Sequence, residues 1–78
     1  MNKVTILLDS YTKIKEFLAT TTTFMSDLDL VKGRYVVDAK SAIGIFTLDL
    51  SKPIDVVIHT VDEDEVVKFQ EVMKKFTA

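Results

Sequence analysis

Apolar and polar residues alternate along three stretches of the chain, and this period of two is typical of strands with one buried face. The stretches are 3–8, 27–37 and 54–60, and their repeating apolar positions are Val4, Ile6 and Leu8, then Leu28 and Leu30, then Ile54, Val56 and Ile58. In the middle stretch Lys32-Gly33 interrupts the alternation, and a glycine can adopt the positive φ that a tight turn needs. The pattern therefore predicts four strands, of which the second and third form a hairpin.

A helix is expected after the first strand, because apolar residues recur there at spacings of three and four. This stripe comprises Ile14, Phe17, Leu18, Thr21, Phe24 and Met25. Asp9 or Ser10 can cap the first turn by accepting bonds from backbone N–H groups. The threonines at 20–23 weaken the later turns, since β-branching restricts their side chains and their hydroxyls compete for backbone hydrogen bonds. We expect this helix to end near Met25.

A second long helix is expected at the end of the chain. It begins at the acidic run 62–65, where the helix dipole favours negative charge, and Asp62 and Glu65 have the spacing of a capping box. Its buried stripe is Phe69, Val72, Met73 and Phe76, and Lys74 and Lys75 lie at its other end. The acidic run is interpreted as helix capping rather than as a metal site, because consecutive residues of one turn point in different directions.

The segment 41–48 is predicted to form a short helix capped by Ser41. Its core-facing residues are expected to be Ala42, Ile45 and Leu48, which recur at intervals of three. Ile43 and Phe46 then lie on another side of the helix, and Gly44 between them keeps that side low. Two large apolar groups that face outward on a small domain indicate a contact surface.

The elements occur in the order β-α-β-β-α-β-α. This order predicts an α+β fold, an open-faced sandwich in which a four-stranded antiparallel sheet carries three helices on one face. The 78 residues are expected to make a single domain, 1–78, and 47% hydrophobic with 28% charged residues is ordinary for a globular chain. The chain has no cysteine, which excludes disulfides and thiolate metal sites and favours a reducing, cytoplasmic location.

Charge and glycine content argue against several classes of function. The formal net charge is −2 and no basic tract is longer than Lys74-Lys75, so direct nucleic-acid binding is not expected. The apolar run near the start is broken by Asp9 and is too short for a signal peptide or a membrane span, so no membrane insertion is expected. With only two glycines the chain has no glycine-rich phosphate loop. We expect neither a cofactor nor a metal.

One segment, 38–48, is similar to the regulatory-serine region of the HPr phosphocarrier family of the bacterial sugar phosphotransferase system. Its sequence is DAKSAIGIFTL. The family pattern is asparagine, a small or apolar residue, lysine, serine, an apolar pair, glycine, another apolar pair, a small residue and leucine. Only Asp38 departs from it, in place of the asparagine. The element order, the chain length and the acidic start of the last helix also resemble this family over nearly the whole chain.

The family's phosphotransfer residues are absent from the matching positions. Counting back without gaps from Ser41 places Ser10 at the phosphohistidine position, Thr12 at the arginine and Lys13 at the proline. A relay needs an imidazole, because its phosphoramidate has a high transfer potential whereas a serine phosphate ester is too stable. An arginine gives phosphoryl oxygens bidentate bonds that neither Thr12 nor Lys13 reproduces. The only histidine, His59, is expected to be a half-exposed strand side chain without a catalytic role.

The resemblance therefore implies a protein that is not an enzyme, does not relay phosphate through histidine, and acts as a regulatory or protein-interaction module. Partner docking is expected at Ile43, Phe46 and Lys40. Ser41 is the candidate phosphorylation site, because a dedicated kinase modifies the matching serine of some family members, although a helix cap alone also explains this serine. The expected partners are an HPr kinase, enzyme I or a transcription regulator. The alternatives are a phosphocarrier with a non-histidine acceptor, and a structural or oligomerisation domain that uses the open face of the sheet.

Overall fold

The computed structural model describes residues 2–77, and the sheet within them has four strands. These are β1 (Lys3–Ile6), β2 (Asp27–Lys32), β3 (Tyr35–Asp38) and β4 (Ile54–His59). Every neighbouring pair is antiparallel, and the order across the sheet is β1-β4-β2-β3. β2 and β3 form the predicted hairpin, with Gly33 in its turn at a φ of 59°.

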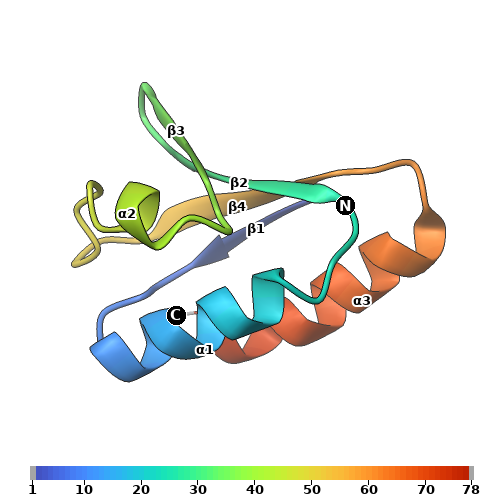
Figure 1. Cartoon of the computed structure of the whole chain (residues 1–78), viewed down its shortest axis with the longest axis horizontal. Helices are drawn as coiled ribbons and strands as arrows, with labels where there is room; N and C mark the ends of the chain where they lie inside the picture. Colours follow the sequence, from blue (N-terminus) through green and yellow to red (C-terminus); the bar gives the residue numbers. More distant parts are fainter. Residues whose placement is uncertain (1, 78) are drawn as a thin grey trace.

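Two long helices, α1 (Tyr11–Thr21) and α3 (Glu63–Met73), lie side by side across one face of the sheet (Figure 1). A 3₁₀ turn (Lys74–Phe76) continues α3, and a single helical turn, α2 (Ala42–Ile45), follows β3. Buried residues from the sheet and from all three helices form one continuous core. This arrangement confirms the predicted α+β open-faced sandwich and its element order.

The core is built from the alternating strand residues and from the aromatic residues of the helices. A row of apolar residues in matched register crosses all four strands: Val4, Val56, Leu30 and Val37. Two edge-to-face aromatic pairs join α1 and the loop after it to the last helical segments, Phe17 with Phe76 at a centroid distance of 5.5 Å and Phe24 with Phe69 at 6.3 Å. Such pairs add to the stabilisation from buried area.

The first helix ends earlier than the sequence predicted. α1 stops at Thr21, and each threonine hydroxyl of 20–23 donates to the carbonyl three or four residues before it, over 2.7–3.1 Å. These side-chain bonds compete with continued helix formation. Phe24 still reaches the core from the following loop, whereas Met25 is 95% exposed and lies outside the buried stripe.

The predicted capping box at the start of α3 is wrong. Asp62 caps the helix by accepting from the Asp64 N–H at 2.9 Å. Glu65 does not return to this cap, because its Oε1 accepts from the Met25 N–H and the Ser26 N–H, both at 3.1 Å, and from the Ser26 hydroxyl at 3.0 Å. The first turn of α3 is thereby tied to the loop that leads into β2.

Candidate functional site

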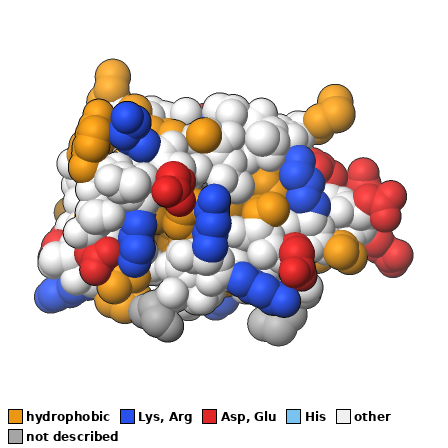
Figure 2. Space-filling view, turned by 90° about the horizontal axis from the view of Figure 1, so that it is seen from below, with side chains coloured by type: hydrophobic (Ala, Val, Ile, Leu, Met, Phe, Trp, Pro, Cys, Tyr) orange, Lys and Arg blue, Asp and Glu red, His pale blue; other side chains and the backbone are white. Residues whose placement is uncertain are grey.

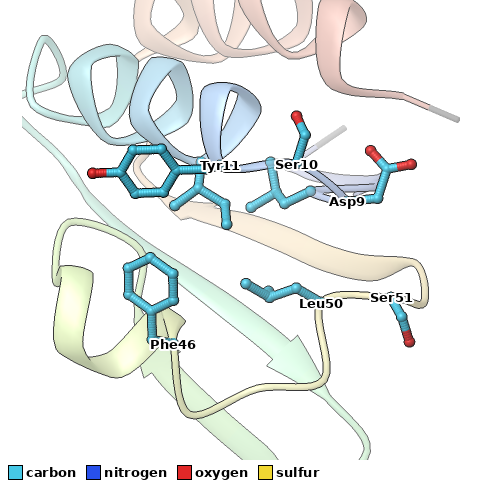
Figure 3. Close-up of a pocket in the computed structure, with 8 residues that line it drawn as sticks. Asp9, Ser10, Tyr11, Phe46, Leu50 and Ser51 are labelled. Carbon is cyan, nitrogen blue, oxygen red and sulfur yellow. The ribbon is translucent and has the colours of Figure 1, made fainter.

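A shallow groove of about 350 Å³ lies between the start of α1 and the segment that follows α2 (Figure 3). Most of its lining is apolar and comes from Leu8, Tyr11, Ile14, Phe46 and Leu50. The polar lining residues are Asp9, Ser10 and Ser51. In Figure 3 the rings of Tyr11 and Phe46 come from the two facing sides of the groove. An apolar hollow with a few polar groups is typical of a binding site.

Ser10 lies at the groove because it caps α1. Its extended backbone, with φ −143° and ψ 153°, turns the hydroxyl back so that Oγ accepts from the Lys13 N–H at 3.2 Å. Lys13 Nζ in turn forms an ion pair with Asp9 Oδ1 at 3.2 Å. The ion pair ties the Lys13 side chain to Asp9, and Lys13 itself does not line the groove. Thr12, the other expected departure from the family pattern, lies in the first turn of α1 and does not line the groove.

His59 does not line the groove, and its hydrogen-bond partner lies elsewhere in the sheet. It ends β4, and its Nε2 lies 2.8 Å from Asp29 Oδ2 on the neighbouring strand β2. The side chain is 53% exposed, which confirms the predicted half-exposed position. The polar groups in the groove lining are hydroxyls and one carboxylate, and no imidazole is among them.

α2 directly precedes the segment that forms one side of the groove, and Ser41 caps α2 as predicted. The Ser41 Oγ accepts from the Gly44 N–H at 3.2 Å. Gly44 lets α2 approach β3 closely, because a Cβ at this position would lie 3.3 Å from the Val37 Cβ. Ile45 and Leu48 are buried, as expected for the side of this segment that faces the core.

The other side of α2 faces solvent. Ile43 is 83% exposed and Phe46 is 54% exposed, which confirms their predicted outward orientation. Ala42, which was expected to face the core, is exposed as well, because α2 makes only one turn and Ala42 is its first residue. Phe46 lines the groove and Ile43 lies one turn before it, outside the lining. The docking role of both residues stays a prediction.

Lys40 does not line the groove. Its Nζ donates to the Phe24 carbonyl at 3.0 Å, and its backbone N–H donates to Asp38 Oδ1 at 2.9 Å. The lysine charge therefore supports the loop between α1 and β2, a contact that the sequence did not predict. Its predicted part in docking is a separate claim and stays a prediction.

The turn at Asp49 holds the far rim of the groove. The Ser51 hydroxyl and the Ser51 N–H donate to Asp49 Oδ1 at 2.6 Å and 3.1 Å. These two bonds, the hydroxyl bond first, lower the pKa of the Asp49 carboxyl below its ordinary value, and the positive charges of Lys52 and Lys32 act in the same direction. The turn fixes Leu50 and Ser51 at the groove.

Sequence reasoning missed the residues that complete the groove. Tyr11 carried a signal, because a large aromatic residue directly after the helix cap and three residues before Ile14 extends the apolar stripe to the first residue of the helix; Tyr11 is 66% exposed. Leu50 carried a weaker one, as an apolar residue inside a polar loop. Nothing in the local sequence shows that Tyr11 and Leu50 line the same groove, because the tertiary fold brings their segments to it.

Figure 2 views the molecule from the side covered by α1 and α3. Lysine and arginine side chains and apolar side chains are scattered over this face, whereas acidic side chains gather at the end of the molecule where α3 begins. Between residues 2 and 77 no helix has both the length and the apolar character needed to cross a membrane. The same residues bring together no group of three or more histidine and acidic side chains that could hold a metal ion.

Solved structures of similar shape identify the fold. A protein described as HPr-C-His from Thermoanaerobacter tengcongensis matches 96% of this chain and 92% of its own, with a TM-score of 0.74 and 26% sequence identity. The chain has the HPr fold. A phosphocarrier protein HPr from Bacillus anthracis str. Ames matches 97% of this chain and 98% of its own, with a TM-score of 0.68 and 19% identity. No protein-family model and no curated protein matches the sequence.

Proposed function

We propose that this chain is an HPr-like protein related to the sugar phosphotransferase system, that it docks protein partners at the groove between α1 and α2, and that it does not relay phosphate through histidine. The observation that carries the proposal is the composition of the groove, which is apolar with a capping serine and no imidazole. The HPr fold of the chain supports the relation to that system.

The chemistry of the groove argues against a phosphate relay. Ser10 Oγ is a helix cap, and neither a histidine nor a free amine lies beside it in the lining. A serine nucleophile needs an adjacent base to activate it. A phosphoserine ester also holds its phosphoryl group too stably for onward transfer. Docking without phosphate transfer is therefore the function that this site supports best.

The exposed apolar side chains around the groove support the docking part. Tyr11, Phe46 and Ile43 are 66%, 54% and 83% exposed; Tyr11 begins α1, Ile43 lies in α2 and Phe46 directly follows α2. Aromatic residues dominate the binding energy at protein interfaces when a partner excludes water from them. We assign Tyr11 and Phe46 as anchors and Ile43 as the adjoining contact. Lys40 holds the loop between α1 and β2 through its bond to the Phe24 carbonyl, and we keep it as a docking residue beside these three.

We further propose that phosphorylation of Ser41 regulates this docking. Ser41 is the cap of α2, so a phosphate there adds a charge of about −1.5 to −2 two residues before the exposed Ile43. A charge of that size next to an apolar contact changes which partners bind. An HPr kinase is the enzyme class whose action the resemblance implies.

Docking is tested by titrating enzyme I and an HPr kinase separately into the protein in a calorimeter. We expect Phe46→Ala to weaken binding about tenfold or more, since buried aromatic anchors are worth about 1.4 kcal/mol or more at an interface. Val67→Ala is the matched control, because Val67 is 65% exposed on α3 and does not line the groove. Equal affinities for the wild type and both variants would refute docking at the groove.

The switch is tested by incubation with an HPr kinase and ATP, followed by intact-mass measurement. We expect one added phosphate in the wild type and none in Ser41→Ala. A mass gain that persists in Ser41→Ala, or no gain in either protein, would remove the switch and leave the docking proposal standing on the titrations.

A further inference from the structure

We propose that β3 pairs with β3 of a second copy of this chain, so that two sheets join into one across a two-fold axis. β3 is an edge strand with β2 on one side only, and its hairpin stands out from the rest of the sheet (Figure 1). The opposite edge, β1, is less suited to pairing. It carries Lys3, and its end is closed where the Leu7 N–H donates to the Phe76 carbonyl at 2.9 Å.

The open side of β3 offers unpaired backbone groups. Residues of an antiparallel strand alternate between bonding to the neighbouring strand and facing away from it. The Ala39 N–H donates to the Leu28 carbonyl at 2.9 Å, so the odd-numbered residues of β3 bond to β2 and the even-numbered residues, Val36 and Asp38, face outward. The Asp38 carbonyl accepts from the Ser41 N–H at 3.1 Å. Both backbone groups of Val36 and the Asp38 N–H therefore face the open edge.

Charge complementarity selects a second copy of the same chain as the occupant. Antiparallel pairing with Val36 opposite Val36 of the second copy places Arg34 opposite Asp38 at both ends of the contact. Arg34 is exposed at the end of the hairpin turn and has no ion pair among residues 2–77. Asp38 gives Oδ1 to the Lys40 N–H, which leaves its other oxygen for a guanidinium. This single register therefore forms two Arg34–Asp38 ion pairs, one at each end of the contact.

The side chains of the strand fit the same register. Tyr35 is 71% exposed and Val36 is 61% exposed, which is unusual for two adjacent large apolar residues of one strand. In the pair, the two Val36 side chains meet on the open face, and Tyr35 lies opposite Val37 of the second copy on the other face. Aromatic and β-branched cross-strand neighbours stabilise a sheet. The run Tyr35-Val36-Val37 also lacks the charged residue or proline that usually protects an edge.

β3 has four residues, so the contact is smaller than a standard interface and the dimer is weak. Sedimentation velocity between about 10 μM and about 1 mM covers the affinities expected of such a contact. We expect the dimer fraction of the wild type to rise over this range. The amide NMR signals of Val36 and Asp38 should shift with concentration, because both N–H groups face the edge. A monomer at every concentration would overturn the proposal.

Charge reversal identifies the register. Arg34→Asp places two acidic pairs at the contact and should weaken dimerisation about tenfold or more. Asp38→Arg alone should do the same, and a mixture of the two variants should restore a heterodimer, because each then meets the opposite charge. Lys3→Asp is the matched control on the other edge and should dimerise as the wild type does.

Dimerisation that Arg34→Asp leaves unchanged, or that Lys3→Asp weakens instead, would overturn the pairing through β3. Circular dichroism checks that each variant is folded. Should Asp38→Arg fail to fold through loss of its bond to Lys40, the comparison of Arg34→Asp with Lys3→Asp decides the question alone.

Discussion

Replacing Glu65 with alanine should loosen the attachment of α3 to the loop before β2. One carboxylate oxygen accepts three hydrogen bonds there, from the Met25 N–H, the Ser26 N–H and the Ser26 hydroxyl. A hydrogen bond to a charged group contributes about 1.5–3 kcal/mol when it is buried. The three bonds share one oxygen, and the Met25 N–H reaches water once freed. We therefore expect the free energy of unfolding to fall by about 2 kcal/mol in total.

Glu63→Ala is the matched control for Glu65→Ala. Glu63 lies in the same first turn of α3, and its removal takes the same charge from the helix start without breaking a side-chain hydrogen bond among the described residues. The loss of a favourable charge–dipole interaction should cost about 0.5 kcal/mol. Glu65→Gln keeps an acceptor oxygen but loses the charge, so its cost should lie between those of the two alanine variants.

Urea unfolding monitored by circular dichroism measures these differences. For a domain of this size a loss of 2 kcal/mol moves the unfolding midpoint by roughly 1–2 M urea, or the melting temperature by roughly 8–16 °C. Amide exchange at Met25 and Ser26 should accelerate in Glu65→Ala and stay unchanged in Glu63→Ala. Equal stabilities of the two alanine variants would refute the assignment of Glu65 as the attachment of this loop.

Three further predictions concern other parts of the fold. Thr21→Val should lower the free energy of unfolding by about 1–2 kcal/mol in the same urea assay, because the fully buried Thr21 hydroxyl donates to the Ala39 carbonyl at 3.1 Å and valine leaves that carbonyl unpaired. Ser41→Ala should cost about 1 kcal/mol by removing the cap bond from the Gly44 N–H, whereas Ser41→Asp should keep the cap and the stability. The folded-state pKa of Asp49 is lowered, so the turn that Asp49 holds is intact at pH values above the ordinary aspartate pKa of about 3.9 and is lost as the pH falls through the lowered pKa. An NMR titration of the Asp49 carboxyl should therefore give a midpoint below the ordinary aspartate pKa.

The sequence predicted the strands well because their buried faces are set by local alternation. Leu28 and Leu30 on β2, and Ile54, Val56 and Ile58 on β4, all face the core as the pattern indicated. The end of α1 was placed too late, because Phe24 continues the helical spacing although it reaches the core from a loop. Threonine hydroxyls, whose competition with the helix was anticipated, end it at Thr21.

Contacts between distant segments were not predictable from local spacing. Glu65 matched a capping box with Asp62, yet its partners lie in the loop before β2. In the candidate site, the outward orientation of Phe46 followed from its position on a short helix. Its place opposite the start of α1 in one groove did not, since Tyr11 and Phe46 come from segments far apart in the chain.

That this chain docks partners without relaying phosphate is tested most directly by incubating the protein with enzyme I and phosphoenolpyruvate. Binding and intact mass are measured on the same sample at neutral pH. We predict that the protein binds enzyme I, that Phe46→Ala weakens the binding, and that no acid-labile phosphate is incorporated. Acid-labile phosphate that builds up to one group per chain would contradict the account, because it would show that a residue of this chain carries phosphate in the relay.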